Sequence, residues 1–158
     1  MEKNKVVLCK LVLCLLLLSI LGACATIPSD KDAFPMCADD VSRNSQRLLS
    51  LMADSSGRFI DRDDAAFGDF QSAFRAKLNS VDLRAQDQMA FYFVSGHPEV
   101  TRKVVFCDRD QYLIPPDHLV SEDVKQVRIE PLGINGEGYM RCIRIQEQWF
   151  YVETYLPT

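Results

Sequence analysis

The chain has 158 residues, of which 47% are hydrophobic and 25% are charged, and its formal net charge is −4. This length suits one domain with a substantial core. A mildly acidic chain lacks the basic footprint that nucleic-acid binding requires, so we exclude nucleic acid as a partner.

The first 23 residues have the pattern of an export signal. Lys3, Lys5 and Lys10 form a basic head, and residues 11–23 then run without a charge. This apolar core is shorter than the stretch of about 20 residues that a membrane-spanning helix needs. A basic head, a short apolar core and small residues before a cut site predict a secretory signal peptide.

The end of that segment, Leu21-Gly22-Ala23-Cys24, resembles the lipobox of bacterial lipoproteins. The resemblance implies cleavage before Cys24, a diacylglyceryl group on its thiol and a further acyl chain, such as palmitate, on the new amino group. One acyl chain binds a bilayer only marginally, whereas two or three hold a protein durably. In this family an Asp after the cysteine retains the protein at the inner membrane. Ala25 stands there in this chain, so the resemblance favours the outer membrane, facing the periplasm.

Cleavage would remove three Lys and one Glu with the signal peptide, which leaves 135 residues and a net charge of −6. Pro28 and Pro35 oppose a helix, so we predict that residues 24–36 form a lipidated tether. Extended, residues 25–36 would reach roughly 40 Å. A single domain is then expected over residues 37–158.

The first half of this domain has the spacing of helices. Asp39 or Asp40 is expected to cap a helix that ends at Gly57, and Asp61 to begin a second helix. A third helix is predicted over Leu83–Val94, capped by Asp82. The apolar residues that carry the first two predictions are Val41, Leu48, Leu51 and Met52, then Phe67, Phe70, Phe74 and Leu78.

The second half changes to the period of strands. We predict strands at Thr101–Cys107 and around Val127 and Ile129, and a hairpin of Tyr139–Ile145 with Trp149–Leu156. Opposing Ile143 to Phe150 puts Ile143, Ile145, Phe150 and Val152 on the core face of the hairpin, and Cys142, Arg144, Trp149 and Tyr151 on the other. Arg141 then points toward the core, so either the register is wrong or an acidic partner lies inside. The expected class is α+β, with N-terminal helices packed on a C-terminal antiparallel meander of about four strands.

This order of elements, with a Gly-rich entry to the hairpin and Trp149 opening the last strand, resembles the cystatin-type cones of nuclear transport factor two-like proteins and of small lipoproteins built like them. Members of that fold include enzymes, binding proteins and assembly factors, so the resemblance leaves the function open.

Three cysteines remain beside Cys24 after cleavage, namely Cys37, Cys107 and Cys142. In an oxidising compartment we expect one disulfide and one buried thiol. Three pairings are open, and we favour Cys107–Cys142 because both lie in predicted strands. The alternative is three unpaired cysteines packed as small hydrophobic residues.

The remaining polar patterns favour no cofactor and no metal. His97 and His118 are the only histidines, and nothing local builds a nucleophilic pair with Cys107. The acidic stretches 61–64 and 108–110 do not match a calcium loop, because arginines interleave them and the Gly and Glu positions fail.

Three functions follow for testing. The leading hypothesis is a non-catalytic, lipid-anchored module that binds or assembles with an envelope protein, with Arg144, Trp149 and Tyr151 as its interaction surface. The second is a small-molecule enzyme or ligand-binding protein with a cone-shaped pocket, in which Arg144 or His97 would work with an acid. The third is an obligate component of a larger envelope complex, which predicts an exposed apolar patch.

Overall fold

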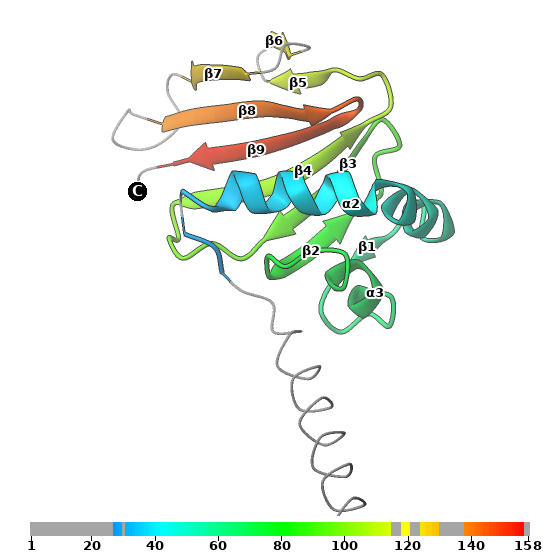
Figure 1. Ribbon diagram of the computed structural model, residues 1–158. Coiled ribbons are helices and arrows are strands. Elements are labelled where there is room, and N and C mark those ends of the chain that lie inside the picture. The colour runs from blue at the N-terminus through cyan, green and yellow to red at the C-terminus, as the bar shows by residue number, and fades with distance from the viewer. Residues whose placement is uncertain (1–26, 30, 115–117, 121–123, 130–137, 157–158) are drawn as a thin grey trace, which may run out of the picture.

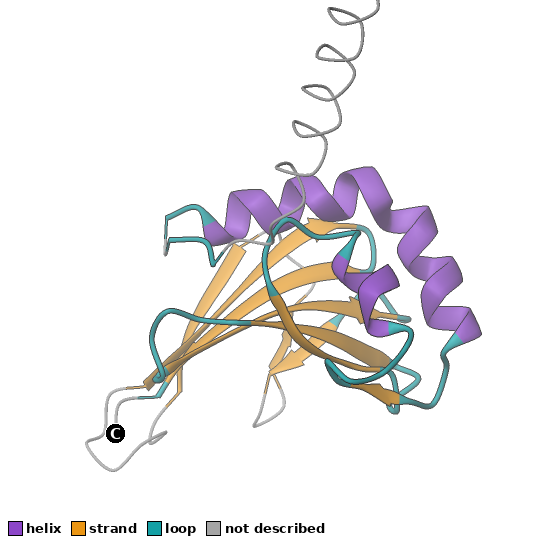
Figure 2. Ribbon diagram, turned by 90° about the horizontal axis from the view of Figure 1, so that it is seen from below, coloured by secondary structure: helices purple, strands orange, loops and turns teal. Residues whose placement is uncertain are grey.

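The computed structural model describes residues 27–29, 31–114, 118–120, 124–129 and 138–156. One long helix, α2 (Ala33–Asp54), and one short helix, α3 (Phe67–Gln71), lie on the same face of an antiparallel sheet (Figures 1 and 2). A small two-stranded sheet, β5–β6, lies on the opposite face (Figure 2). The expected α+β class is therefore confirmed.

The main sheet has seven strands in the order β1-β2-β3-β4-β9-β8-β7, and every neighbouring pair is antiparallel. This is a wider sheet than the predicted meander of about four strands. The strands are β1 (Phe59–Ile60), β2 (Leu78–Asp82), β3 (Gln88–Phe93), β4 (Val100–Cys107), β5 (Tyr112–Ile114), β6 (His118–Val120), β7 (Val124–Ile129), β8 (Gly138–Gln146) and β9 (Trp149–Tyr155).

Helix α2 buries the face that its sequence pattern predicts. Cys37, Val41, Leu48 and Met52 follow one another at intervals close to whole turns, and all are buried. The helix begins at Ala33, however, so Asp39 and Asp40 lie inside it and cap nothing. Pro35 is tolerated because first-turn N–H groups have no partner within the helix.

The predicted tether is therefore too long. Residues 33–36 belong to α2, and Ala33 is only 1% exposed. Pro28 is also buried, although it lies before the helix. Pro28 packs against the domain just before α2 begins. Pro35 lies in the first turn of α2, where a proline does not disrupt a helix as it would in the helix interior.

The second predicted helix is mostly wrong, since α3 ends at Gln71 and Leu78 begins β2. The Gln71 amide donates to the carbonyls of Phe74 and Ala76 (both 3.1 Å), and its carbonyl oxygen accepts from the Leu78 N–H at 2.9 Å. These bonds to the backbone replace further helical turns. Phe70 and Phe74 still reach the core from this short segment.

The third predicted helix is wrong as well, because Gln88–Phe93 forms β3 in the middle of the sheet. Its alternate residues Met89, Phe91 and Phe93 face the helices, and Ala90 and Tyr92 face the other side. Pairing with β2 and β4 makes this segment a strand, because these tertiary contacts outweigh its weak helical propensity.

The main core lies between the helices and the sheet and consists largely of aromatic rings. The Phe91 ring centroid lies 5.9 Å from Trp149, 5.5 Å from Phe74 and 6.0 Å from Phe70. Trp149 also contacts Phe106 edge to face at 5.2 Å. These rings fill the layer between the helices and the sheet in the described part of the chain.

The predicted hairpin is present, but its register differs by one residue. Ile143 opposes Tyr151 and Cys142 opposes Val152, with an irregularity between Arg144 and Gln146. Trp149 and Tyr151 therefore face the helices with Ile143, whereas Phe150 and Val152 face the other side. The predicted core face of the hairpin is wrong for β9, because a one-residue slip exchanges its two faces.

Candidate functional site

The three cysteines that the structure describes beyond Cys24 are free and buried. Strand β9 separates β4, which carries Cys107, from β8, which carries Cys142. Two strand spacings are about 9.5 Å, beyond the roughly 7 Å between Cα atoms that a disulfide spans. The predicted Cys107–Cys142 disulfide is therefore wrong, and Cys37 lies on the helix side, away from both.

Burial also makes these thiols poor nucleophiles. Burial raises the pKa of Cys37, Cys107 and Cys142 to about 12 each. A thiol attacks as its thiolate, which is scarce near neutral pH at such a pKa. His97 lies in the turn before β4 and Cys107 at its far end, so they form no pair. His118 begins β6.

The predicted interaction surface of Arg144, Trp149 and Tyr151 does not exist as one surface. Trp149 is 2% exposed and Tyr151 is 1% exposed, both under the helices. Arg144 lies on the opposite side, where its guanidinium donates to the Asp110 carboxylate. That carboxylate also accepts from the Gln148 N–H, so Asp110 fixes the β4–β5 turn against the hairpin. Cys24 lies outside the described residues.

The other acidic stretch also stabilises a turn. The Asp61 carboxylate accepts from the Asp63 N–H at 3.1 Å, and Asp64 accepts from Arg58 at 2.6 Å and from the Ala66 N–H at 2.9 Å. These contacts hold the segment between β1 and α3.

The sheet face opposite α2 carries a chain of contacts that sequence reasoning missed. We call it the aromatic–cation strip, and its members come from five different segments. The Arg84 guanidinium lies 5.1 Å from the Phe59 ring centroid, and the Lys103 ammonium lies 5.6 Å from both the Tyr92 and the Tyr112 rings. The strip consists of Phe59, Arg84, Tyr92, Lys103 and Tyr112.

Asp82 fixes the Arg84 end of the strip. Its carboxylate accepts from Arg84 Nε at 2.9 Å and Nη2 at 2.7 Å, and the Arg84 hydrogen bond lowers the Asp82 pKa. Burial raises the pKa of the neighbouring Tyr92, with a further contribution from the Asp82 charge. The strip thus consists of two groups of cation–aromatic contacts on one face of the sheet, with the Asp82 carboxylate holding Arg84 at one end.

Lys103 is the least ordinary member of the strip. Burial lowers its pKa, while Cys107 and Cys142 oppose this shift. A cation over an aromatic face is stabilised more strongly when water is excluded. Two tyrosine rings around a partly buried lysine provide such a setting.

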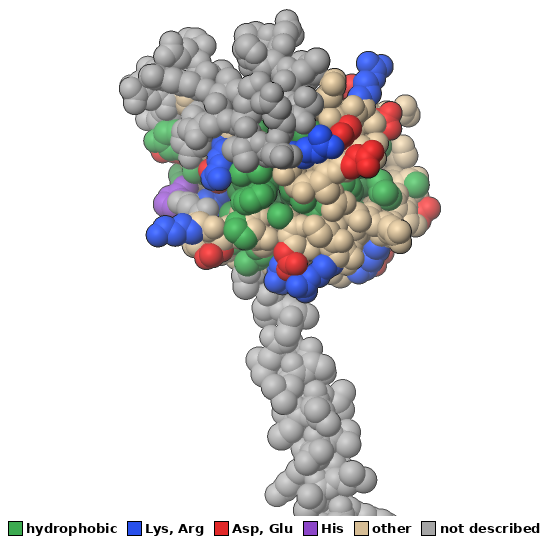
Figure 3. Space-filling model, turned by 45° about the horizontal axis from the view of Figure 1, so that its top comes forward, with side chains coloured by type: hydrophobic (Ala, Val, Ile, Leu, Met, Phe, Trp, Pro, Cys, Tyr) green, Lys and Arg blue, Asp and Glu red, His purple; other side chains and the backbone are tan. Residues whose placement is uncertain are grey.

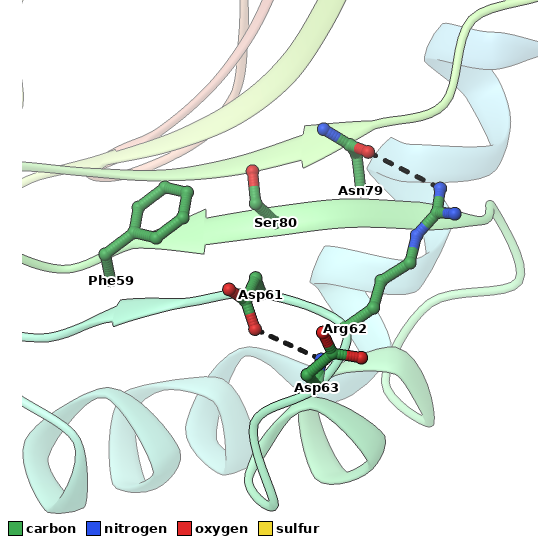
Figure 4. A pocket seen from close by; sticks show the side chains of 6 residues that line it. All are labelled: Phe59, Asp61, Arg62, Asp63, Asn79 and Ser80. Atoms are coloured by element: carbon green, nitrogen blue, oxygen red, sulfur yellow. Dashed lines mark hydrogen bonds between the residues drawn. The ribbon is translucent and has the colours of Figure 1, made fainter.

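A groove opens beside the Phe59 end of the strip, at the edge of the sheet (Figure 4). Its volume is about 310 Å³, and Phe59, Asp61, Arg62, Asp63, Asn79 and Ser80 line it. Figure 4 shows the side chains of Phe59, Asn79 and Ser80 on one side of the strands, with Arg62 reaching Asn79 at 3.4 Å. Phe59 is 46% exposed, so part of its ring is accessible at the wall of the groove.

A second polar cluster lies on the helix side, close to the N-terminal end of the domain. Arg102 Nε donates to Glu153 Oε2 at 3.1 Å, and these residues are 2% and 8% exposed. The Tyr151 hydroxyl donates to the same carboxylate oxygen at 3.2 Å. Arg102 Nη1 also donates to the Pro28 carbonyl at 3.4 Å, so this ion pair holds the segment before α2 against the sheet.

One sequence signal could have revealed this cluster. Arg102 alternates with Val104 and Phe106 in β4, so its side chain had to point toward the core with them. A charged residue at an inward position requires a partner, because a buried charge is costly without one. The Phe59 end of the strip gave no such signal, because β1 has two residues and is too short for an alternation of inward and outward positions to be recognised.

Charges of both signs are interspersed on the face shown in Figure 3, around hydrophobic side chains in the centre of the view. No family model, curated protein or solved structure matches the chain. The resemblances to lipoproteins and to the nuclear transport factor two-like cone therefore stay predictions. None of the helices in the described part is long and apolar enough to cross a membrane.

Proposed function

We propose that the chain is a lipid-anchored, non-catalytic binding or assembly module of the bacterial cell envelope, facing the periplasm, and at the outer membrane rather than the inner. The observation that carries the anchor is Leu21-Gly22-Ala23-Cys24 directly after the charge-free run 11–23. The anchor needs the lipid, because the mature chain would be acidic and has no polybasic attraction to anionic headgroups.

The aromatic–cation strip supports the binding role. Tyrosine, arginine and exposed phenylalanine are the residues that anchor protein interfaces, because they combine large contact area with directional polar groups. Phe59 and Arg84 stand at its exposed end, beside the groove, and Asp82 holds Arg84 in place. We propose that an envelope protein partner contacts this end.

The anchor is tested by replacing the cysteine. In the native host, Cys24→Ser is expected to abolish palmitate incorporation and leave the uncleaved precursor, whereas Cys14→Ser, within the same segment, should change neither. Mass spectrometry of the purified wild-type chain should give an acylated N-terminus at Cys24. A chain that keeps Met1, or begins at Cys24 without acyl mass, contradicts the anchor.

The binding surface is tested with a matched pair of double variants. Phe59→Ala with Arg84→Ala removes the exposed end of the strip. Leu49→Ala with Arg43→Ala removes an exposed apolar residue and an ion-paired arginine from α2. After cross-linking in cells and detergent pull-down, partners retained by the control and lost by the strip variant support the proposal. We expect at least a tenfold loss, because interface anchors contribute more than about 1.4 kcal/mol each.

The alternative is a small-molecule enzyme or ligand-binding protein. The position of Lys103 between the Tyr92 and Tyr112 rings favours this second function, because burial lowers its pKa and so shifts its ammonium toward the amine form, which is the nucleophilic one. Lys103 would then react on the sheet face that carries the strip, and the site would not be the cone-shaped pocket of the second hypothesis. Conversion or binding of a small molecule that Lys103→Met abolishes, with partner capture unchanged, would replace the binding proposal.

A further inference from the structure

The tether between the lipidated cysteine and the folded domain is much shorter than the sequence suggests. The carbonyl of Pro28 accepts from the buried Arg102, and Pro28 itself is buried. After Ser29 the chain turns, with Ala33 N–H bonded to the Ser29 carbonyl at 3.0 Å, and α2 begins. Only residues 25–27 therefore separate Cys24 from the first residue packed against the domain.

Covalent geometry limits what three residues can span. From Cys24 to Pro28 an extended chain reaches at most about 14 Å. A domain of 100 residues has a radius of gyration of about 13 Å, so this tether is no longer than the radius of the domain it carries. A tether this short prevents the domain from standing clear of the bilayer or turning freely above it.

The short tether also selects which end of the domain meets the lipid. Pro28 is bonded to Arg102 near the start of β4, where β9 ends, because Val100 pairs with Tyr155. The segment before α2 and the end of β9 lie on the same side of the molecule (Figure 1). The Leu156 N–H donates to the Glu99 carbonyl at 2.9 Å, which fixes Leu156 at this same end.

Two exposed aliphatic side chains mark this end. Ile27 is 49% exposed and Leu156 is 39% exposed, and they are two of four large hydrophobic residues exposed in the described part. Apolar side chains at a bilayer surface gain free energy by entering the headgroup and acyl boundary. A position next to the lipid anchor gives both residues such a surface.

We propose that the domain docks on the bilayer surface through the end that carries Ile27, Leu156 and the turn 95–99, held there by the three-residue tether. This rests on the proposed lipidation of Cys24. The opposite ends of the strands, including the turn between β8 and β9, then face away from the membrane. The occupant of this surface is the lipid bilayer that holds the anchor, and not a second protein.

The test measures the depth of a single introduced tryptophan. Full-length lipidated protein carrying Leu156→Trp is reconstituted into phosphatidylethanolamine–phosphatidylglycerol vesicles with brominated acyl chains, which quench nearby indoles. The matched control is Leu49→Trp, since Leu49 is 40% exposed. It lies 16 residues beyond Ala33 in α2, about 24 Å along the helix axis. The buried Trp149 of the wild-type chain gives the background emission and reports the fold.

We expect the added tryptophan of Leu156→Trp to lose at least half of its emission and that of Leu49→Trp to be unchanged. Inserting ten Gly and Ser residues between Thr26 and Ile27 should remove the quenching of Leu156→Trp, because such a linker adds about 17 Å of average reach. Acylated protein in which positions 156 and 49 are quenched alike, or in which the insertion changes nothing, overturns docking and leaves the anchor intact. Protein without acyl mass at Cys24 overturns the anchor itself.

Discussion

The buried pair of Arg102 and Glu153 gives the sharpest test of how this fold is stabilised. The two residues oppose each other across β4 and β9, and the guanidinium and carboxylate are 3.1 Å apart. At that distance the gross attraction is about 5 kcal/mol for an effective dielectric constant of about 20. Most of it offsets the cost of taking both charges out of water, so the pair itself adds little net stability.

Removing one partner is a different matter, because the other charge stays buried. We expect Arg102→Met to lower the free energy of unfolding by about 3–5 kcal/mol. The triple variant Arg102→Met, Glu153→Leu and Tyr151→Phe removes both charges and the hydroxyl that bonds to Glu153. It should recover most of the loss, to within about 1–2 kcal/mol of the wild type.

Equilibrium unfolding in urea of the chain from residue 25 onward measures both variants, with the slope of the transition checked for two-state behaviour. A cost below about 1 kcal/mol for Arg102→Met would refute the reasoning, because it would mean that water reaches Glu153 in the folded state. A triple variant no more stable than Arg102→Met would also contradict it, since the loss would then come from packing and not from an uncompensated charge.

Three further predictions follow from burial. The three buried thiols should resist a disulfide-exchange reagent in the folded chain and react fully in urea. Because their pKa of about 12 exceeds the ordinary value, unfolding should become easier as pH rises from about 9 to 12, by up to about 1.4 kcal/mol per pH unit for each thiol. Thermal unfolding across this range checks the sign, and a midpoint independent of pH contradicts it. Asp40→Asn should cost about 1–3 kcal/mol, since the 4% exposed carboxylate accepts from Arg75 N–H and Nε at 2.9 and 2.7 Å. The exposed neighbour Asp39, which also bonds Arg75, is the control, and Asp39→Asn should cost less than about 1 kcal/mol.

The comparison of α2 with β3 shows which local patterns were reliable. The apolar residues Val41, Leu48 and Met52 recur at helical spacing over several turns, a pattern that a strand does not produce. The helix could therefore be predicted. Gln88–Phe93 is shorter and carries residues that suit either state. Its state was decided by two neighbouring strands that local sequence cannot reveal.

The hairpin shows a different kind of error. The two strands could be located because apolar and polar residues alternate, but the register depended on an irregularity near Ile145. One displaced residue exchanges the two faces of β9, so Trp149 and Tyr151 went from the expected outer face to the core. The order of the strands, and not their register, puts Cys107 and Cys142 on the two strands that flank β9, so the predicted disulfide between them does not form.

The sequence alone determined the α+β class, which long helical and alternating patterns predict, and it carries the proposal of export and a lipid, which rests on a short apolar run before a cysteine that resembles a lipobox. These features depend on residues that are neighbours in the chain, so local order is enough to reveal them. The aromatic–cation strip, the buried Arg102–Glu153 pair and the packing of Pro28 against the domain were decided only by the tertiary structure. Each joins residues far apart in sequence, such as Pro28 with Arg102 and Phe59 with Arg84, and only the packed sheet and helices bring such residues into contact.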